Sequence, residues 1–424
     1  MLLSIFTPVH PASLPYIEEA YKSLLAQDYT CWEWIVLANG GAEIPPHVAR
    51  ELARDPRVRL ISHTGKGGNV GQLKRAACER CTGDVLVELD ADDLLTPDAL
   101  TCIAQAFADP AVMFAYSNDA EFADATWEPH VYSDYYGWQT RPFEHQGHAL
   151  QEMVAWEPSP WMMRFIYFAP DHVRAWRRSA YYALGGHNPD LEVADDHDLC
   201  CRTYLTYGAA GIRHMDRCLY LYRVRADSTS HGERNGAIQE QTHRNYWTYA
   251  EGLAMRWALD SALRMLDLGG RLDAKPGHET VDLFDAHVTA DLRDVWPFED
   301  NTIGVIRASH VFEHLPDPVH AMNEAYRVLA PGGWLFIEVP STDGRGAFQD
   351  PTHVSFWNEN SFWYYTTRQY AQFVPAFNGR FQKSLVQTYF PSEWWQENQI
   401  PVVRADLIAL KPPYSDRPVG EVLI

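Results

Sequence analysis

The sequence lacks long apolar runs and an N-terminal leader pattern. No window in its 424 residues approaches the roughly 18–20 apolar residues that cross a bilayer. Met1 leads almost directly into a strand-like run instead of a charged leader and a long apolar segment. These absences predict a soluble, cytoplasmic protein without a membrane span.

Basic residues are also scarce. The chain has 35 Lys and Arg against 56 Asp and Glu, which gives a formal net charge of −21. A field of this sign repels phosphate backbones and anionic lipids. We therefore expect neither nucleic acid nor an anionic membrane as a partner, and basic acceptor surfaces become more plausible.

Cysteines are few and scattered, and their number, seven, is odd. A chain of this size needs no disulfide framework, so they agree with a reducing compartment. Cys78 and Cys81 form a lone CxxC on an expected helix over residues 72–81. An ordinary helix face is favoured there over a zinc or redox site, and packing is expected for Cys200 and Cys201.

No standard phosphate-binding loop is present either. The Gly-rich loop over residues 65–71 fits neither GxGxxG nor GxxxxGK[ST]. We interpret it as a rim over a nucleotide, with Lys74 or Arg75 on the following helix contacting phosphate.

What the chain does contain is a regular alternation of strand and helix patterns. A hydrophobic fraction of 46% with 15 Trp indicates a globular protein of two or three domains. Apolar strands over residues 2–9 (ended by Pro8), 34–37, 58–62 and 85–89 alternate with helical patterns, beginning with residues 14–27. This rhythm predicts a doubly wound α/β domain with a parallel sheet.

The most informative stretch is the acidic end of the fourth strand. Asp90, Asp92 and Asp93 follow the apolar run 85–89, at the sheet edge where α/β proteins bind ligands. Carboxylates this close repel one another unless a cation lies among them, which predicts Mg²⁺ or Mn²⁺ with positions left for phosphate oxygens. The alternative is an acidic cap on the helix that follows Thr96-Pro97-Asp98, a role that Asp93 alone could fill.

The order of the motifs resembles that of the inverting family-2 glycosyltransferases with the GT-A fold, over roughly residues 2–230. The resemblance rests on these motifs: Thr7-Pro8-Val9, Asn69-x-Gly71, Thr82-Gly83-Asp84, Leu89-Asp90-Ala91-Asp92-Asp93, Arg177-Arg178-Ser179-Ala180-Tyr181 with Gly185-Gly186-His187-Asn188, Ala194-Asp195-Asp196-His197-Asp198-Leu199, and Tyr222-Arg223-Val224-Arg225. It implies a nucleotide-sugar donor site lined by Thr7, Pro8, Asn39, Lys74, Arg75, Asp90, Ala91, Asp92 and Arg225.

The same resemblance implies individual roles. Asp90 would meet the ribose side of the donor, and Asp92 would ligate the metal that bridges the diphosphate. Asp196 falls where the family keeps its catalytic base, which takes the acceptor's proton, and Asp195 replaces the usual Glu before it. The residues alone leave another interpretation open, a solvated acidic helix start at residues 195–198.

Two positions depart from the family pattern. Asn39 stands where many members hold the donor base with Asp. A UDP-sugar is still the expected donor, but the residue that usually recognises the uracil base is replaced. Arg225 stands where a His often completes the metal site. His231 is the substitute metal ligand, or else Arg225 pairs directly with phosphate.

A long aromatic segment, residues 127–168, separates the two halves of this domain and includes Trp138, Trp156 and Trp161. Aromatic side chains with a polar edge can stack on sugars, which predicts an acceptor region. A helical lid packed on the core is the alternative.

After a composition shift near residues 232–236 and helical segments to Leu263, the strand rhythm restarts at residues 264–268, 280–283, 303–310 and 334–339. Residues 266–410 resemble class I S-adenosylmethionine-dependent methyltransferases. The resemblance rests on Leu266-Asp267-Leu268-Gly269-Gly270, Val281-Asp282, Ala290-Asp291-Leu292, the string Ala308 to Leu315, and Val328-Leu329-Ala330-Pro331-Gly332-Gly333. It implies cofactor contacts from Asp267, Gly269, Gly270, Asp282, Asp291 and Ser309.

Two features of this half stand apart from that pattern. The spacing from Asp267 to Asp282 is too short for the usual helix between the first two strands, and the turn lacks its third Gly. His310-Val-Phe-Glu313-His314 matches the HxxEH of inverted zinc peptidases, but no third ligand is evident and an ordinary helix start is favoured. Downstream, His353 is predicted as a base for O-methylation, with a structural His as the alternative.

The sequence thus predicts two doubly wound α/β domains: a GT-A domain over 1–235, a helical linker over 236–265 and a Rossmann-like methyltransferase domain over 266–424. We expect a metal-dependent hexosyltransferase that modifies a glycan or protein, including a surface or phage structural protein, and O-methylates the sugar or acceptor. The alternative is an inactive second domain that binds acceptor or mediates oligomerisation; a homo-oligomer is possible.

Overall fold

The computed structural model describes residues 1–39, 42–62, 69–225, 235–270 and 275–412. The chain divides into two compact units, Met1–Asp134 with Trp138–Leu253 and Tyr135–Gly137 with Ala254–Ile424. The division falls within helix α8 (Asn235–Asp260), one continuous helix inside the stretch expected to be a linker. The Gly-rich loop to Gly68 and His231 lie outside the described residues.

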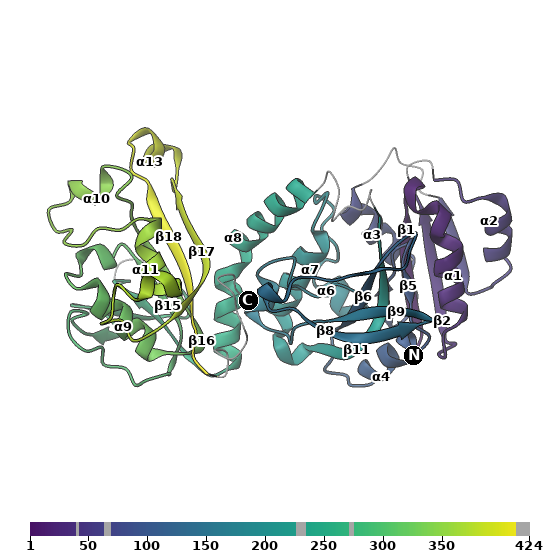
Figure 1. The fold of residues 1–424 in the computed structure, drawn as a ribbon, viewed down its shortest axis with the longest axis horizontal. Coiled ribbons are helices and arrows are strands. Elements are labelled where there is room, and N and C mark those ends of the chain that lie inside the picture. Colours follow the sequence, from purple (N-terminus) through teal and green to yellow (C-terminus); the bar gives the residue numbers. More distant parts are fainter. Residues whose placement is uncertain (40–41, 63–68, 226–234, 271–274, 413–424) are drawn as a thin grey trace. The chain divides into compact units, whose positions relative to one another are not determined.

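The described residues of the N-terminal unit form an 11-stranded sheet whose main order is β3-β2-β1-β4-β10-β6-β11-β5. Figure 1 shows this unit in purple to teal. The parallel strands β1, β2, β3 and β4 give the doubly wound half, and β10 joins antiparallel between β4 and β6. The strands are β1 (Leu3–Val9), β2 (Trp32–Ala38), β3 (Val58–Ser62), β4 (Val85–Glu88), β5 (Leu94–Leu95), β6 (Phe114–Ala123), β7 (Pro129–His130), β8 (Gln139–His145), β9 (His148–Val154), β10 (Arg174–Arg177) and β11 (Ile212–Val224).

Helices pack on this sheet through buried side chains, many of which are apolar. In α1 (Ile17–Leu25), Ile17, Ala20, Tyr21 and Leu24 recur at helical spacing and are buried. The other helices are α2 (Pro46–Leu52), α3 (Val70–Cys78), α4 (Ala99–Ala106), α5 (Pro160–Met163), α6 (Arg178–Ala183) and α7 (Asp195–Tyr207), with 3₁₀ turns η1 (Pro11–Tyr16), η2 (Asp134–Tyr136) and η3 (Ala209–Gly211).

Two local expectations for this unit were wrong. Pro8 does not end the first strand, because β1 continues to Val9 and Pro8 pairs in register with Leu37. The aromatic segment is not a helical lid, since its main element is the β8–β9 hairpin and its one α-helix, among the described residues, is the four-residue α5.

The motif Asn69-x-Gly71 has a structural explanation. Asn69 caps α3 by accepting the Gln72 amide at 2.8 Å and donates its own amide to the Pro189 carbonyl at 2.5 Å. A Cβ at Gly71 would lie 2.1 Å from the Asn188 carbonyl oxygen, so only glycine allows this approach. The motif therefore holds α3 against the loop that precedes α7.

The C-terminal unit is a seven-stranded sheet of order β14-β13-β12-β15-β16-β18-β17. β12 to β16 are parallel, and β18 enters antiparallel between β16 and β17. The strands are β12 (Arg264–Leu268), β13 (Glu279–Asp282), β14 (Val288–Thr289), β15 (Ile303–Ser309), β16 (Leu329–Pro340), β17 (Phe381–Tyr389) and β18 (Val402–Ala409).

Helical elements are unevenly distributed in this unit. They are η4 (Phe312–His314), α9 (Pro318–Val328), α10 (Gly346–Gln349), η5 (Glu359–Phe362), α11 (Trp363–Thr366), α12 (Arg368–Ala371) and α13 (Glu393–Glu397). The described residues between Gly269 and Asn301 form no helix, which agrees with the short spacing between the first two strands. The sheet and α9 enclose an apolar core that includes Leu266, Ile306, Phe312 and Ile337.

Candidate functional site

The acidic turn after β4 is anchored by its third carboxylate. Asp93 is buried and accepts hydrogen bonds from the Tyr220 hydroxyl at 2.8 Å and the Arg223 amide at 2.7 Å. Burial raises the pKa of Asp93 well above its usual value. Asp93 does not cap a helix, because α4 begins only at Ala99. It instead joins the turn to β11.

The other two carboxylates of the turn face charged neighbours. Burial raises the pKa of Asp90 to about 7, and the charge of Lys74 opposes that rise. The Oδ2 atom of Asp92 lies 3.1 Å from Nη1 of Arg225, which also donates to the Ala12 carbonyl. Arg225, predicted as a phosphate contact, is thus placed beside the predicted metal ligand.

A cation fits this end of β4. Asp90, Asp93 and His172 each offer one ligand atom, and these atoms lie within 4.8 Å of one another. Burial raises the pKa of both Asp90 and Asp93, and the charge of Asp92 adds to each rise, which a divalent ion would relieve. Burial keeps His172 neutral by lowering its pKa well below the usual value, the form in which imidazole binds metals.

A buried ionic network lies next to this turn. Arg174 donates from Nε to Glu88 at 2.9 Å, and its Nη1 lies 2.8 Å from Asp196. Lys74 Nζ lies 2.5 Å from Glu88. Burial raises the pKa of Asp196, but the charges of Arg174 and Lys74 outweigh it and hold that pKa well below the usual value. Asp196 is therefore ionised at neutral pH.

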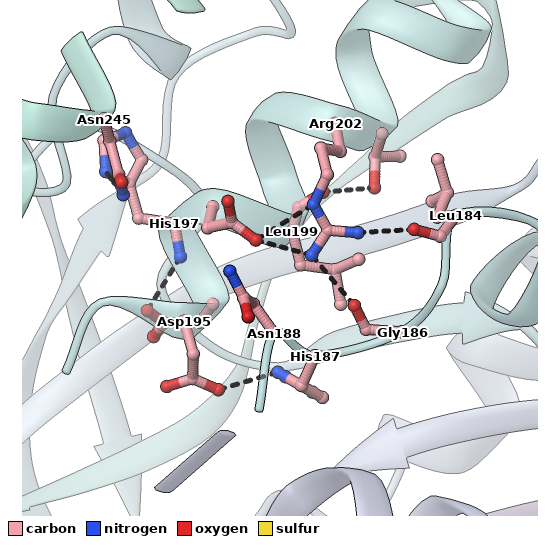
Figure 2. A network of polar contacts seen from close by, with 12 residues as sticks. Leu184, Gly186, His187, Asn188, Asp195, His197, Leu199, Arg202 and Asn245 are labelled. Atoms are coloured by element: carbon pink, nitrogen blue, oxygen red, sulfur yellow. Dashed lines mark hydrogen bonds and ion pairs between the residues drawn. The ribbon is translucent and has the colours of Figure 1, made fainter. Parts of the chain in front are cut away.

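The acidic start of α7 divides into one accessible and two structural carboxylates. Arg202 donates to Asp198 at 2.5 Å and to the carbonyls of Leu184 and Gly186 at 2.6 and 2.8 Å. Figure 2 shows dashed lines from Arg202 to Leu184 and Gly186. The Asp195 carboxylate is buried 2.8 Å from Nδ1 of His187. Only Asp196 keeps a partly exposed side chain, at 18%.

His197, between these carboxylates, is fixed by three contacts. Its amide donates to Asp196 at 2.7 Å, its Nε2 lies 2.8 Å from the Met163 carbonyl, and its Nδ1 lies 3.2 Å from the Asn245 amide (Figure 2). The ring therefore orients the first turn of α7 and, with it, the Asp196 side chain. The interpretation of residues 195–198 as a merely solvated helix start is wrong, because Asp195 and Asp198 are buried.

The remaining predicted donor residues fall into two groups. Thr7, Asn39, Lys74 and Ala91 are buried, and the Thr7 hydroxyl donates to the Leu89 carbonyl at 2.7 Å. Pro8 is half-buried, and the Arg75 side chain is 43% exposed, with Nε 3.8 Å from Glu79. The Asn39 side-chain oxygen is buried and has no hydrogen-bond partner among the described residues.

Sequence reasoning missed a second acidic group. Asp119 and Glu121 lie on one face of β6, and together with Asp171 they offer three ligand atoms within 4.8 Å. Burial raises the pKa of Asp119 well above its usual value. Asp119 and Glu121, two residues apart in the strand Phe114–Ala123, were the available signal. Arg174 and Glu88 gave no comparable signal, because their pairing depends on β10 and β4 being neighbours.

The four cysteines singled out in the sequence are buried, but the helix expected over residues 72–81 ends at Cys78, before Cys81. Cys78, at the end of α3, and Cys81 are buried free thiols, and burial raises the pKa of Cys81 to about 12. A thiol with so high a pKa is a poor nucleophile and metal ligand. Cys200 and Cys201 are buried on α7 and contribute to packing.

In the C-terminal unit, the predicted cofactor residues line the ends of β12, β13 and β15. Gly269 has φ of +69°, and a Cβ there would lie 2.6 Å from Val311, so this turn requires glycine. A Cβ at Gly270 would likewise lie 2.6 Å from an Asp267 carboxylate oxygen. Asp267 is buried in an ion pair with Arg307 at 3.0 Å.

The other predicted cofactor residues have local partners. Asp282 ends β13 and accepts the Leu283 amide at 2.6 Å, and Ser309 ends β15. Hydrogen bonds from Arg293 lower the pKa of Asp291 to about 2. The structure also brings His353 to the HxxEH motif, since Glu313, His314 and His353 offer ligand atoms within 4.8 Å of one another. The motif itself forms a 3₁₀ turn, not the expected helix start.

The sheet order and the acidic strand ends define a GT-A glycosyltransferase unit followed by a methyltransferase-type unit. Residues 4–167 match the family model of glycosyl transferase family 2, and residues 243–337 match that of a methyltransferase domain. The chain therefore carries a glycosyl transferase family 2 domain and a methyltransferase domain.

Relatives of the chain agree with this assignment. It is 28% identical over 261 residues to the O-antigen biosynthesis protein RfbC of Myxococcus xanthus, covering 60% of this chain and 18% of that protein. It is 25% identical over 245 residues to chondroitin synthase of Escherichia coli, covering 57% and 31%. The chain thus spans less than a third of either relative.

Among solved structures, S. aureus TarS 1–349 in complex with UDP-GlcNAc superposes with a TM-score of 0.45 at 15% identity, over 65% of this chain and 77% of that one.

Among the described residues, no helix combines the length and apolarity needed to cross a membrane.

Proposed function

We propose that the N-terminal unit is a metal-dependent, inverting hexosyltransferase that uses a nucleotide sugar, with UDP-sugar as the expected donor. The observation that carries this proposal is the meeting of two unlike carboxylate sets. Asp90 and Asp93 have raised pKa values at the end of β4, whereas Asp196 has a lowered one beside Arg174. The acidic turn, which also carries Asp92, suits a cation, and Asp196 is ionised and can accept a proton.

In this proposal Asp92 would hold Mg²⁺ or Mn²⁺, with Asp90 towards the ribose. The ion, when bound, supplies positive charge that stabilises the departing diphosphate. Arg225 lies beside Asp92 and can exchange its carboxylate for a phosphate oxygen, which its planar guanidinium suits. His231 stays a predicted metal ligand.

Asp196 would take the proton of the acceptor hydroxyl as that oxygen attacks the anomeric carbon from the face opposite the diphosphate. Arg174 keeps the carboxylate ionised, and His197 fixes its orientation. A low pKa makes Asp196 a weak base. Proton transfer to Asp196 is therefore easier when the acceptor hydroxyl is held at close range.

The acceptor we propose is a glycan, or a protein carrying one. The two relatives are named for O-antigen biosynthesis and chondroitin synthesis, which supports a glycan. Trp138 is half-buried, with its ring 5.9 Å from that of the buried Trp156, and Tyr167 is 45% exposed. Such rings offer faces on which sugars stack.

For the C-terminal unit we propose O-methylation of the transferred sugar or of the acceptor. Gly269 would admit the methionine part of S-adenosylmethionine, and Asp282 its ribose hydroxyls. Support comes from the strand order and from the glycine-only turn at Gly269. An inactive module that binds acceptor or another copy of the chain is the second candidate, favoured by the lack of a helix in the described residues from Gly269 to Asn301.

Product mass separates these candidates. Purified protein is incubated with Mn²⁺, a panel of UDP-hexoses, glycan acceptors and S-adenosylmethionine. Sugar plus methyl mass supports two active units, and sugar alone supports the inactive module. No sugar transfer or donor hydrolysis from any UDP-hexose, with GDP- and dTDP-sugars as comparison, would contradict the proposed donor class.

A further inference from the structure

We propose that Glu313, His314 and His353 form a site for a divalent transition metal of the Zn²⁺ type in the C-terminal unit. These residues offer one ligand atom each within 4.8 Å of one another. Two of them come from η4, and the third comes from a loop after α10. The site is independent of the proposed glycosyl transfer.

The two histidine rings already have the tautomer that a metal needs. Nδ1 of His314 lies 3.2 Å from the Thr352 carbonyl oxygen, and Nδ1 of His353 lies 3.0 Å from the Ala347 carbonyl oxygen. A carbonyl only accepts, so in the neutral rings these contacts place the proton on Nδ1 and leave the lone pair of Nε2 for a metal. Metal-bound histidines typically donate their second N–H in this way, which fixes the ring.

The carboxylate supplies an independent observation. Glu313 is 2% exposed, and its Oε2 atom is buried without a hydrogen-bond partner among the described residues. Its Oε1 atom lies 3.2 Å from Nδ1 of His310. A buried carboxylate oxygen without a partner costs free energy, and a cation would supply the missing interaction. His310 would then orient the Glu313 carboxylate through its contact with Oε1.

Backbone contacts hold the two ligand-bearing segments together. The amides of Val354 and Ser355 both donate to the Glu313 carbonyl, at 2.8 and 3.0 Å, and the Ser355 hydroxyl donates to the Phe312 carbonyl at 2.8 Å. The residues next to His353 are therefore fixed to the turn that carries Glu313 and His314. A site on such a framework is preorganised for binding.

The ligand set indicates the class of metal. Two imidazoles and one carboxylate suit zinc and its transition-metal neighbours better than Mg²⁺ or Ca²⁺, which prefer oxygen. Three protein ligands leave a position for water or a substrate oxygen. Asp350 Oδ2, 3.9 Å from His353 Nε2, is the nearest additional carboxylate of the loop. A metal-bound His353 is not a free base, so this role replaces the one predicted from sequence.

The test is a zinc titration of the full chain in an Asp92→Asn background, which removes the proposed ligand of the N-terminal site. Competition with a chromophoric chelator should show a tight equivalent that depends on Glu313, His314 and His353. Glu313→Gln, His314→Ala and His353→Ala should each lower the affinity by more than the about 10–100-fold that loss of an outer partner costs. His320→Ala is the matched control, because the hydrogen bond of its ring among the described residues goes to the Asp294 carbonyl, and it should bind as the background does.

Two further readouts separate metal binding from folding. His314 is exposed, so His314→Ala should melt like the background without metal but lose the stabilisation by zinc. Co²⁺ should give the strong visible absorption of a four-coordinate site with nitrogen ligands, and the three ligand variants should lose it. The proposal is overturned if the background binds no zinc equivalent, or if His314→Ala and Glu313→Gln bind zinc as tightly as the background does.

Discussion

Arg174 Nη1 lies 2.8 Å from Asp196 Oδ2 in the interior of the N-terminal unit. The same guanidinium donates to Glu88, which also binds Lys74. Arg174 thus pairs with two carboxylates at once, the structural Glu88 and the candidate catalytic Asp196. The stability of the sheet and the ionisation of the base are linked through it.

Replacing this arginine tests the structural side of that link. Arg174→Met leaves two carboxylates without their main cation, and breaking a buried pair costs about 3–5 kcal/mol. We expect a fall of that size in the free energy of unfolding by urea. Arg213→Met, which removes an exposed pair with Asp109, should change it by less than about 1 kcal/mol. Equal losses of unfolding free energy in Arg174→Met and Arg213→Met would contradict a structural role of Arg174.

Asp196→Asn tests the chemical step. The amide cannot take a proton, so turnover should fall by about a hundredfold or more while donor affinity stays unchanged. Initial rates and calorimetric donor binding measure the two quantities separately. Asp190→Asn, an exposed neighbour, should leave both unchanged. Weaker donor binding at normal turnover would place the base elsewhere.

Asp119→Asn tests the buried acidic group through pH. Burial raises the pKa of Asp119 in the folded chain, so folding favours its protonated form. Its contribution to stability is therefore lost as pH rises above the unfolded value of about 4 towards the raised one. The variant should gain thermal stability over wild type at pH 8 relative to pH 5. The same difference in thermal stability between variant and wild type at pH 5 and pH 8 would argue against the raised pKa of Asp119. Asp109→Asn serves as the control at an exposed aspartate.

Asp282→Ala tests the second cofactor site. The variant loses two charge-assisted hydrogen bonds to ribose, each worth about 1.5–3 kcal/mol. Its affinity for S-adenosylmethionine should therefore fall by at least tenfold. Sugar transfer should persist while the product loses its methyl mass. Calorimetry and product mass measure these effects, with the exposed Asp294→Ala as control. A wild type that binds no S-adenosylmethionine at millimolar concentration would instead support the inactive module.

Strand and helix periodicity predicted most parallel strands of both sheets, because buried strands such as Trp32–Ala38 and Ile303–Ser309 consist mainly of apolar residues. The antiparallel strands β10 and β18 were not predicted. The acidic turn after β4 was equally visible. The hairpin β8–β9 was missed, since β8 is exposed at most positions and its sequence shows no regular apolar alternation.

The partners of the site residues depend on tertiary neighbours and could not be predicted. Arg174 reaches Asp196 only because β10 inserts antiparallel beside β4. Similarly, His353 was not visible as a third ligand of the HxxEH motif, because a loop far along the chain returns to Glu313 through backbone hydrogen bonds. Burial also decided which of the clustered aspartates stay accessible, and sequence spacing carries no such information.

Metal-dependent donor binding by the turn after β4 is the central claim, and calorimetric titration of UDP into the full chain with Mn²⁺ tests it most directly. Removal of Mn²⁺ with EDTA should abolish binding by wild type. With Mn²⁺ present, Asp92→Ala should bind UDP at least about 100-fold more weakly, because the diphosphate loses its counter-charge. Equal UDP affinity in wild type with EDTA, wild type with Mn²⁺ and Asp92→Ala would contradict the account.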